Sequence, residues 1–142
     1  MIDLLNNPTF SAFLGVVIGA GLSYIAGSFL ARKQRRDSHR AAVRAIAYEL
    51  SENLPKVQNP KAPGQLTTAA YDALLIPLYT DLPDDVAHHV SLAYALIHVT
   101  GPSVKALSAD QHKIIRAEVE AAQGTIVNYA ERAFHMSFNP PQ

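Results

Sequence analysis

The residues from Phe10 to Ala31 form an apolar stretch that contains no charged side chain. As an α-helix, these 22 residues extend about 33 Å at the standard rise per residue. The hydrocarbon core of a bilayer is about 30 Å thick, so a helix of this length can cross it. Asn7 can cap the helix, and Pro8 suits its first turn, where the missing N–H has no partner in any case. The stretch therefore predicts a transmembrane helix to which the rest of the chain is attached.

Two other interpretations of this stretch fit its flanks less well. A secretory signal peptide carries basic residues before a short apolar run, whereas the only charge before Phe10 is Asp3 and the basic residues come afterwards. A buried core helix of a soluble protein rarely runs this far without a charged residue. We therefore expect a membrane span that is not cleaved.

A basic cluster follows the stretch directly and predicts its orientation. Its members are Arg32, Lys33, Arg35, Arg36, Arg40 and Arg44, accompanied by a single acid, Asp37. Basic flanks of membrane spans stay in the cytoplasm, so residues 32–142 are expected to be cytoplasmic and the N-terminus to lie outside. The same six side chains are expected to contact anionic lipids, at about 1 kcal/mol for each residue near the surface. No nucleic-acid partner is expected, because no aromatic residues interleave with them.

Small residues recur every four positions along the apolar stretch and predict a packing face. They are Ser11, Gly15, Gly19, Ser23, Gly27 and Ala31. Small side chains let helix backbones approach closely, which favours association of helices in lipid. Each step of four residues drifts by about 40° on a helix, so the six positions wind through about 200°. We expect other transmembrane helices, from a second copy or a different protein, to pack near the middle of this face.

Charge and composition limit what the remainder of the chain can be. The 142 residues have a formal net charge of zero, but residues 32–44 carry +5 (six basic, one acidic) and residues 45–142 carry −4 (six basic, ten acidic). The acidic part is expected to be repelled by anionic membranes and by nucleic acid. The absence of cysteine excludes disulfides, thiolate metal sites and cysteine nucleophiles. About 110 residues follow the span, enough for one small domain.

The first helix is expected to continue out of the membrane. It runs from Pro8 to about Leu54, is bounded by Pro55, and is followed by a loop over residues 56–64. Its apolar face after the basic cluster comprises Val43, Ile46, Ala47, Leu50 and Leu54. Thr67 or Thr68 is expected to cap a second helix that ends or kinks at Pro77. The apolar face of this second helix comprises Tyr71, Leu74, Leu75 and Leu78.

Two further helices are predicted after Leu82. One begins with Pro83 at its first position and stops at Gly101, with an apolar face of Val86, Val90, Ala93, Tyr94 and Ile97. The last follows a capping box between Ser108 and Gln111 and runs from Ala109 to about Met136. Its apolar residues form a heptad seam of Ile115, Val119, Ala122, Ile126, Tyr129, Ala133 and Met136.

The predicted fold is all-α: a single N-terminal transmembrane helix continues into a small cytoplasmic bundle of about four antiparallel helices. The expected parts are a short extracytoplasmic tail (1–9), the transmembrane helix (10–31), a basic juxtamembrane helix (32–44), the bundle (45–137) and a tail (138–142). No convincing alternation of period two indicates a strand.

No motif in the sequence indicates catalysis, a cofactor or a metal. His88 and His89 are adjacent and point about 100° apart on a helix, which does not suit a shared metal ion. Glu49 and Glu52 are expected to be solvated surface beside the apolar face, whereas Asn53 is expected to enter the bundle and bond a loop. No glycine-rich phosphate loop is present, since Gly15, Gly19 and Gly21 lie in the span.

The order of a span, a basic patch and a helix ending in residues 48–54 (YELSENL) resembles small bacterial single-pass membrane proteins over the first 54 residues. The leading hypothesis is a non-enzymatic accessory or scaffold subunit of a bacterial inner-membrane complex. One alternative is a phage or host lysis factor, similar to a spanin, with a periplasmic helical body. Another is a membrane-tethered enzyme whose site the sequence does not reveal.

Overall fold

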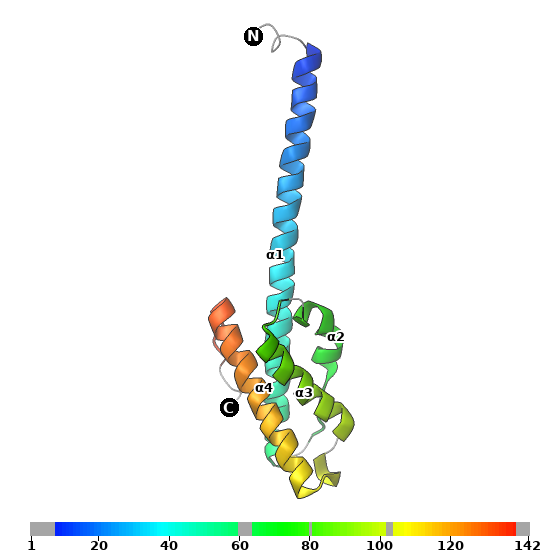
Figure 1. Cartoon of the computed structure of the whole chain (residues 1–142), viewed down its shortest axis with the longest axis vertical. Coiled ribbons are helices and arrows are strands. Elements are labelled where there is room, and N and C mark those ends of the chain that lie inside the picture. Colours follow the sequence, from blue (N-terminus) through cyan, green and yellow to red (C-terminus); the bar gives the residue numbers. More distant parts are fainter. Residues whose placement is uncertain (1–7, 60–63, 80, 102–103, 139–142) are drawn as a thin grey trace. The chain divides into compact units, whose positions relative to one another are not determined.

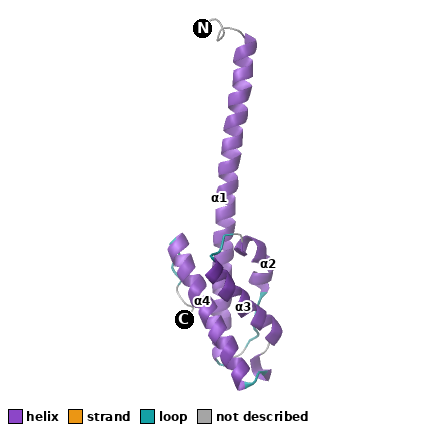
Figure 2. Cartoon of the chain, in the orientation of Figure 1, coloured by secondary structure: helices purple, strands orange, loops and turns teal. Residues whose placement is uncertain are grey.

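The computed structural model describes residues 8–59, 64–79, 81–101 and 104–138, and over these ranges the chain is helical with no strand (Figure 2). The elements are α1 (Pro8–Gln58), α2 (Ala69–Tyr79), α3 (Asp84–Thr100), the 3-10 helix η1 (Val104–Ala106) and α4 (Ala109–Phe134) (Figure 1). An all-helical fold with a long apolar N-terminal helix is therefore confirmed.

Some predictions fall outside the described residues. They concern Asn7 and the rest of residues 1–7, the side chains of Ser11 and Pro77, residues 60–63 of the expected loop, Pro102, and residues 139–142 of the C-terminal tail.

The chain divides into two compact units, Met1–Asp37 and Ser38–Gln142. The first unit contains the apolar part of α1, and every side chain described there, from Gly15 to Asp37, is exposed. The large apolar side chains among them include Val16, Ile18, Leu22, Tyr24 and Phe29. In the described chain one helix, between Gly15 and Gln58, is long and apolar enough to cross a membrane.

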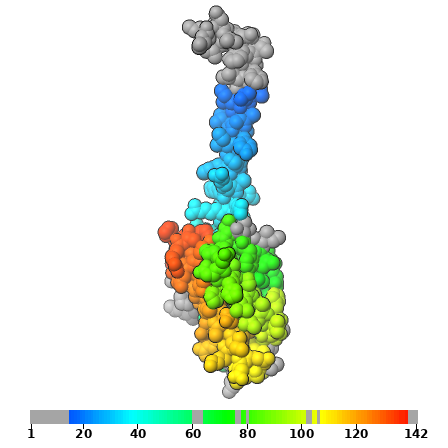
Figure 3. Space-filling view, viewed as in Figure 1, coloured from blue at the N-terminus to red at the C-terminus, as the bar shows by residue number. Residues whose placement is uncertain are grey.

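The second unit is built around one hydrophobic core to which α1, α2, α3 and α4 all contribute. The largest fully buried side chains are Tyr94, Ile46, Leu50, Leu78, Ile115 and Ile126. Helices α3 and α4 pack against each other, and their surfaces lie side by side in the space-filling view (Figure 3). The core forms because each helix presents one apolar face, and burial of these faces removes them from water.

The apolar faces predicted for α1 and α3 are confirmed. Val43, Ile46, Ala47 and Leu50 are fully buried and Leu54 packs partly buried against them. All five residues of the predicted α3 face are buried as well. Gly101 ends α3 as predicted: it adopts a φ of 74°, and its N–H donates to the carbonyl of Ile97 at 2.9 Å. The capping box at Ser108 is also present.

The predicted end of α1 is wrong. The helix passes through Pro55 and ends at Gln58, so residues 56–58 are helical rather than loop. Two contacts account for the extra turn. Val57 is fully buried in the core, and the N–H of Asn59 donates to the carbonyl of Pro55 at 3.0 Å. Proline removes its own N–H and its ring crowds the carbonyl four residues earlier. The single turn that remains after Pro55 is held in place by the buried side chain of Val57.

Three smaller predictions about the other helices also need correction. Leu75 is not on the packed face of α2, because its side chain is 43% exposed. Pro83 is the N-cap of α3 rather than its first residue, which leaves Asp84 and Asp85 to begin the helix. Helix α4 ends at Phe134, two residues before Met136, because His135 adopts a left-handed conformation.

The heptad seam predicted for α4 is fully buried only as far as Ile126, although Tyr129 and Met136 still pack partly buried against the core. Beyond this point Ala130 is buried, whereas Tyr129 is half-buried. A straight helix has 3.6 residues per turn, so its buried face drifts away from a strict repeat of seven residues. The core therefore meets α4 at Ala130, and Tyr129 is turned toward the edge of the seam.

Candidate functional site

The predicted packing face lies on the part of α1 that belongs to the first unit. A Cβ atom added at Gly15, Gly19 or Gly27 would meet nothing within 4 Å, and Ser23 and Ala31 are exposed. Gly21, which lies off this face, is equally open. Packing among the described residues therefore does not require glycine at these positions, and the face is open to close approach by another molecule.

The six basic residues expected to contact anionic lipids are all exposed. Arg32, Lys33, Arg35 and Arg36 belong to the first unit, whereas Arg40 and Arg44 belong to the second. The guanidinium of Arg44 lies 5.6 Å from the ring centroid of Tyr48, one turn further along α1. Arg40 and Arg44 also line a small pocket with the segment that follows α4.

Glu49 is not solvated surface, as the sequence analysis expected, but is buried with 7% of its area exposed. Its carboxylate accepts hydrogen bonds from the N–H groups of Ala70 and Tyr71, at 2.8 and 3.3 Å, and from the hydroxyl of Tyr94 at 2.7 Å. The two N–H groups lie in the first turn of α2, where they have no partner within the helix. Glu49 therefore caps α2 from a neighbouring helix, and its charge faces the positive end of the helix dipole.

Asn53 lies one turn after Glu49 and holds the chain just before α2. It is fully buried. Its side-chain nitrogen donates to the carbonyl of Thr67 at 2.7 Å, and its oxygen accepts from the N–H of Thr67 at 3.0 Å. The prediction that Asn53 enters the bundle and bonds a loop is confirmed. Together the two side chains fix the start of α2 on α1.

A chain of aromatic hydroxyls continues from Glu49 toward α3. The rings of Tyr71 and Tyr94 are stacked, with centroids 4.0 Å apart and planes 11° from parallel. The hydroxyl of Tyr71 lies 3.3 Å from that of Tyr79, which bonds Ser91. Burial raises the pKa of Tyr94 well above its usual value, and the hydrogen bond to Glu49 raises it further. Burial likewise raises the pKa of Tyr71. These phenols are held in the neutral form, as suits structural hydrogen bonds rather than proton transfer at neutral pH.

The sequence carries a signal for this network in the helical spacing of its polar residues. Glu49 and Asn53 are four residues apart and continue the helical spacing of Ala42 and Ile46, which are both fully buried. His39 was missed in the same way. It lies four residues before Val43, is only 4% exposed, and its Nε2 lies 3.1 Å from the hydroxyl of Tyr129.

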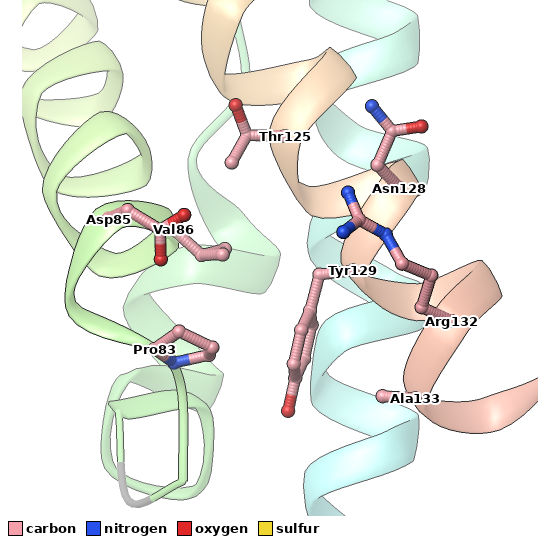
Figure 4. A pocket seen from close by; sticks show the side chains of 8 residues that line it. All are labelled: Pro83, Asp85, Val86, Thr125, Asn128, Tyr129, Arg132 and Ala133. Carbon is pink, nitrogen blue, oxygen red and sulfur yellow. The ribbon is translucent and has the colours of Figure 1, made fainter.

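A cleft with a volume of about 500 Å³ lies between the start of α3 and the second half of α4 (Figure 4). It is lined by Pro83, Asp85, Val86, Thr125, Asn128, Tyr129, Arg132 and Ala133. The opposite charges of Asp85 and Arg132 come from opposite walls (Figure 4). The hydroxyl of Tyr129 also donates to the carbonyl of Asp81 at 3.3 Å. Among the described residues of this lining, no serine, threonine or cysteine is hydrogen-bonded to a histidine.

Two of the histidines pair with acids. His98 Nε2 lies 3.2 Å from Asp72 on α2, and His89 Nδ1 lies 3.9 Å from Glu118 on α4. Among the described residues no group of three or more histidines and carboxylates is arranged to hold a metal ion.

Comparisons of the chain with models of protein families, with curated proteins and with solved structures found no match.

Proposed function

We propose that this chain is a non-enzymatic, single-pass, membrane-anchored interaction protein, an accessory or scaffold subunit of a bacterial inner-membrane complex. The helix around residues 15–31 would cross the membrane, and the second unit would be an antiparallel helical bundle in the cytoplasm. Short connections such as residues 80–83, between α2 and α3, favour antiparallel neighbours in such a bundle.

The observation that carries the proposal is the exposed face of α1 that includes Gly15, Gly19 and Gly27. A Cβ atom added at any of these glycines would meet no described atom within 4 Å beyond the neighbouring turns of the helix. Lipid tails gain nothing from small side chains, whereas a neighbouring helix gains close backbone contact. A second transmembrane helix, from another copy or from a different subunit, is therefore the partner that this face suits.

The polar groups of the second unit support a structural role. Glu49 and Asn53 are occupied in holding α2 on α1. Asn128 and Arg132 line the cleft of Figure 4 without a nucleophile activated beside them. An interaction module needs a stable body and an exposed face, and this arrangement provides both.

The test substitutes isoleucine on the face and beside it. Gly15→Ile/Gly19→Ile should insert normally, because isoleucine is more favourable than glycine in hydrocarbon. Cross-linking in native membranes should, however, show loss of self-association or of co-purifying partners. Gly21→Ile is the matched control, since Gly21 is equally open but off the face, and it should have a smaller effect. If the double variant keeps every partner and the same oligomeric size, the span is only a tether.

A topology measurement separates this proposal from a spanin-like lysis factor. The basic residues after the span predict a C-terminal domain in the cytoplasm, whereas a spanin needs its body in the periplasm. A C-terminal reporter that is active only outside the cytoplasm would overturn the proposed orientation. Cleavage of the body by protease added to intact spheroplasts would have the same meaning.

A further inference from the structure

A small pocket of about 230 Å³ lies between α1 and the segment that follows α4. It is lined by Arg40, Arg44, His135, Met136, Ser137 and Phe138. All six residues belong to the second unit, so the pocket is a feature of one compact body. Two guanidinium groups, an imidazole and a hydroxyl in so small a space are a set of hydrogen-bond donors that suits an anion.

The two arginines have no acidic ion-pair partner among the described residues. Neither Arg40 nor Arg44 forms a hydrogen bond or an ion pair there, and the recorded contact of Arg44 is with the ring of Tyr48. Like charges four residues apart on a helix repel each other by about 0.2–0.5 kcal/mol. An anion bound between them would replace this repulsion with two attractions.

The backbone after α4 forms the opposite wall of the pocket. His135 adopts φ 52° and ψ 39°, a left-handed backbone conformation that residues other than glycine rarely adopt. Its N–H donates to the carbonyl of Glu131 at 3.0 Å. Among the described residues no other non-glycine residue has a positive φ. Strained conformations of this kind persist where the surrounding contacts require them, and they occur often at binding sites.

The residues after His135 alternate between solvent and core. Met136 and Phe138 are half-buried and pack against the core, and the ring of Phe138 lies 5.6 Å from that of Tyr48. His135, which precedes Met136, and Ser137, which lies between Met136 and Phe138, are exposed. The apolar pair therefore anchors the segment beside α1, which leaves the polar pair at the pocket together with the two arginines.

We propose that this pocket binds a phosphate-bearing anion, gripped by Arg40 and Arg44 and bonded further by His135 and Ser137. Guanidinium groups bind phosphate through paired hydrogen bonds. The phosphate comes either from an anionic lipid headgroup or from a soluble phosphate compound. The lipid source rests on the membrane anchorage proposed above, since Arg40 follows the predicted span by nine residues. The soluble source does not depend on that anchorage.

The experiment uses the full chain in a neutral detergent and two probes, inorganic phosphate and short-chain phosphatidylglycerol. Short-chain phosphatidylcholine is the zwitterionic control. Binding is followed by nuclear magnetic resonance at the arginine side-chain N–H groups and the backbone N–H groups of residues 135–138. We expect saturable shifts at these groups. Saturation by phosphatidylglycerol but not by phosphate at the same concentration identifies a lipid site, and equal saturation by both identifies a phosphate site.

Matched double variants separate a pocket from diffuse charge attraction. Arg40→Gln/Arg44→Gln should weaken binding at least tenfold, the loss expected when one charge-assisted hydrogen bond is removed. Arg32→Gln/Arg36→Gln removes the same charge at the same spacing outside the pocket, and binding should stay within about threefold of the original. All four side chains are exposed, so both variants should fold.

Two results would overturn the proposal. One is equal weakening by both double variants, which would mean that the whole basic cluster attracts anions without a site. The other is the absence of saturable shifts with either probe. The outcome is independent of the proposed packing of the span, because binding is measured on the second unit and Gly15→Ile/Gly19→Ile should leave it unchanged.

Discussion

Replacement of Glu49 by alanine should release α2 from α1. The carboxylate is the partner of three donors, namely the N–H groups of Ala70 and Tyr71 and the hydroxyl of Tyr94. A buried donor left without a partner costs about 1–3 kcal/mol, and a helix loses up to about 2 kcal/mol when an anion at its N-terminus is removed. Water can reach a site that is 7% exposed and will recover part of this loss. We expect a net cost of about 3 kcal/mol to the attachment of α2.

Hydrogen–deuterium exchange of the full chain in detergent measures this cost locally. Every 1.4 kcal/mol changes an equilibrium constant tenfold, so the residues of α2 should exchange roughly 100-fold faster in Glu49→Ala. Glu52→Ala is the matched control, because Glu52 is exposed on the same helix and its replacement has the same effect on helix propensity. Glu49→Gln should give an intermediate rate, since an amide has one acceptor oxygen for the three donors.

Two results would contradict this role of Glu49. One is the same exchange rate in α2 for Glu49→Ala and Glu52→Ala, and the other is an equal rise of exchange throughout α3 and α4 in Glu49→Ala. The first result would mean that the bonds to Glu49 contribute nothing net. The second would mean that α2 has no separate attachment and opens only when the whole bundle unfolds.

Two further predictions concern the core of the second unit. Ile126→Asp places an unpaired charge at a fully buried position and should lower the free energy of unfolding by about 3–5 kcal/mol, measured by thermal denaturation. Ile114→Asp changes a 55% exposed position and should alter this free energy by less than about 1 kcal/mol. Equal effects of the two variants would mean that the buried face of α4 lies elsewhere. Burial raises the pKa of Tyr94 above its usual value of 10.0. The contribution of this side chain to stability is therefore complete below pH 10. Above pH 10 it is lost by up to about 1.4 kcal/mol per pH unit, because ionisation favours the unfolded chain. Tyr94→Phe should make the alkaline decline less steep, and an unchanged slope would contradict the burial of this phenol.

Most of the fold follows from local sequence patterns. The helical spacing of apolar residues in α3 and in the second half of α1 predicted their buried faces correctly, because a helix with one apolar face has one way to bury it. The capping box at Ser108 and the C-terminal cap at Gly101 were also predicted correctly. These motifs act within one turn of the chain, so no tertiary contact is needed to form them.

The sequence alone therefore determined the helical class, the apolar helix with its small residues and basic flank, and most of the apolar residues on the buried faces of α1 and α3. Tertiary structure decided which polar residues belong to that core. Glu49 and Glu52 look alike in the sequence, yet only Glu49 meets the open N-terminus of α2. The turn after Pro55 and the pocket at Arg40 likewise depend on contacts between residues far apart in the chain. The physical reason is that a buried polar group is stable only when a partner meets it, and the position of that partner is set by the packing of the helices.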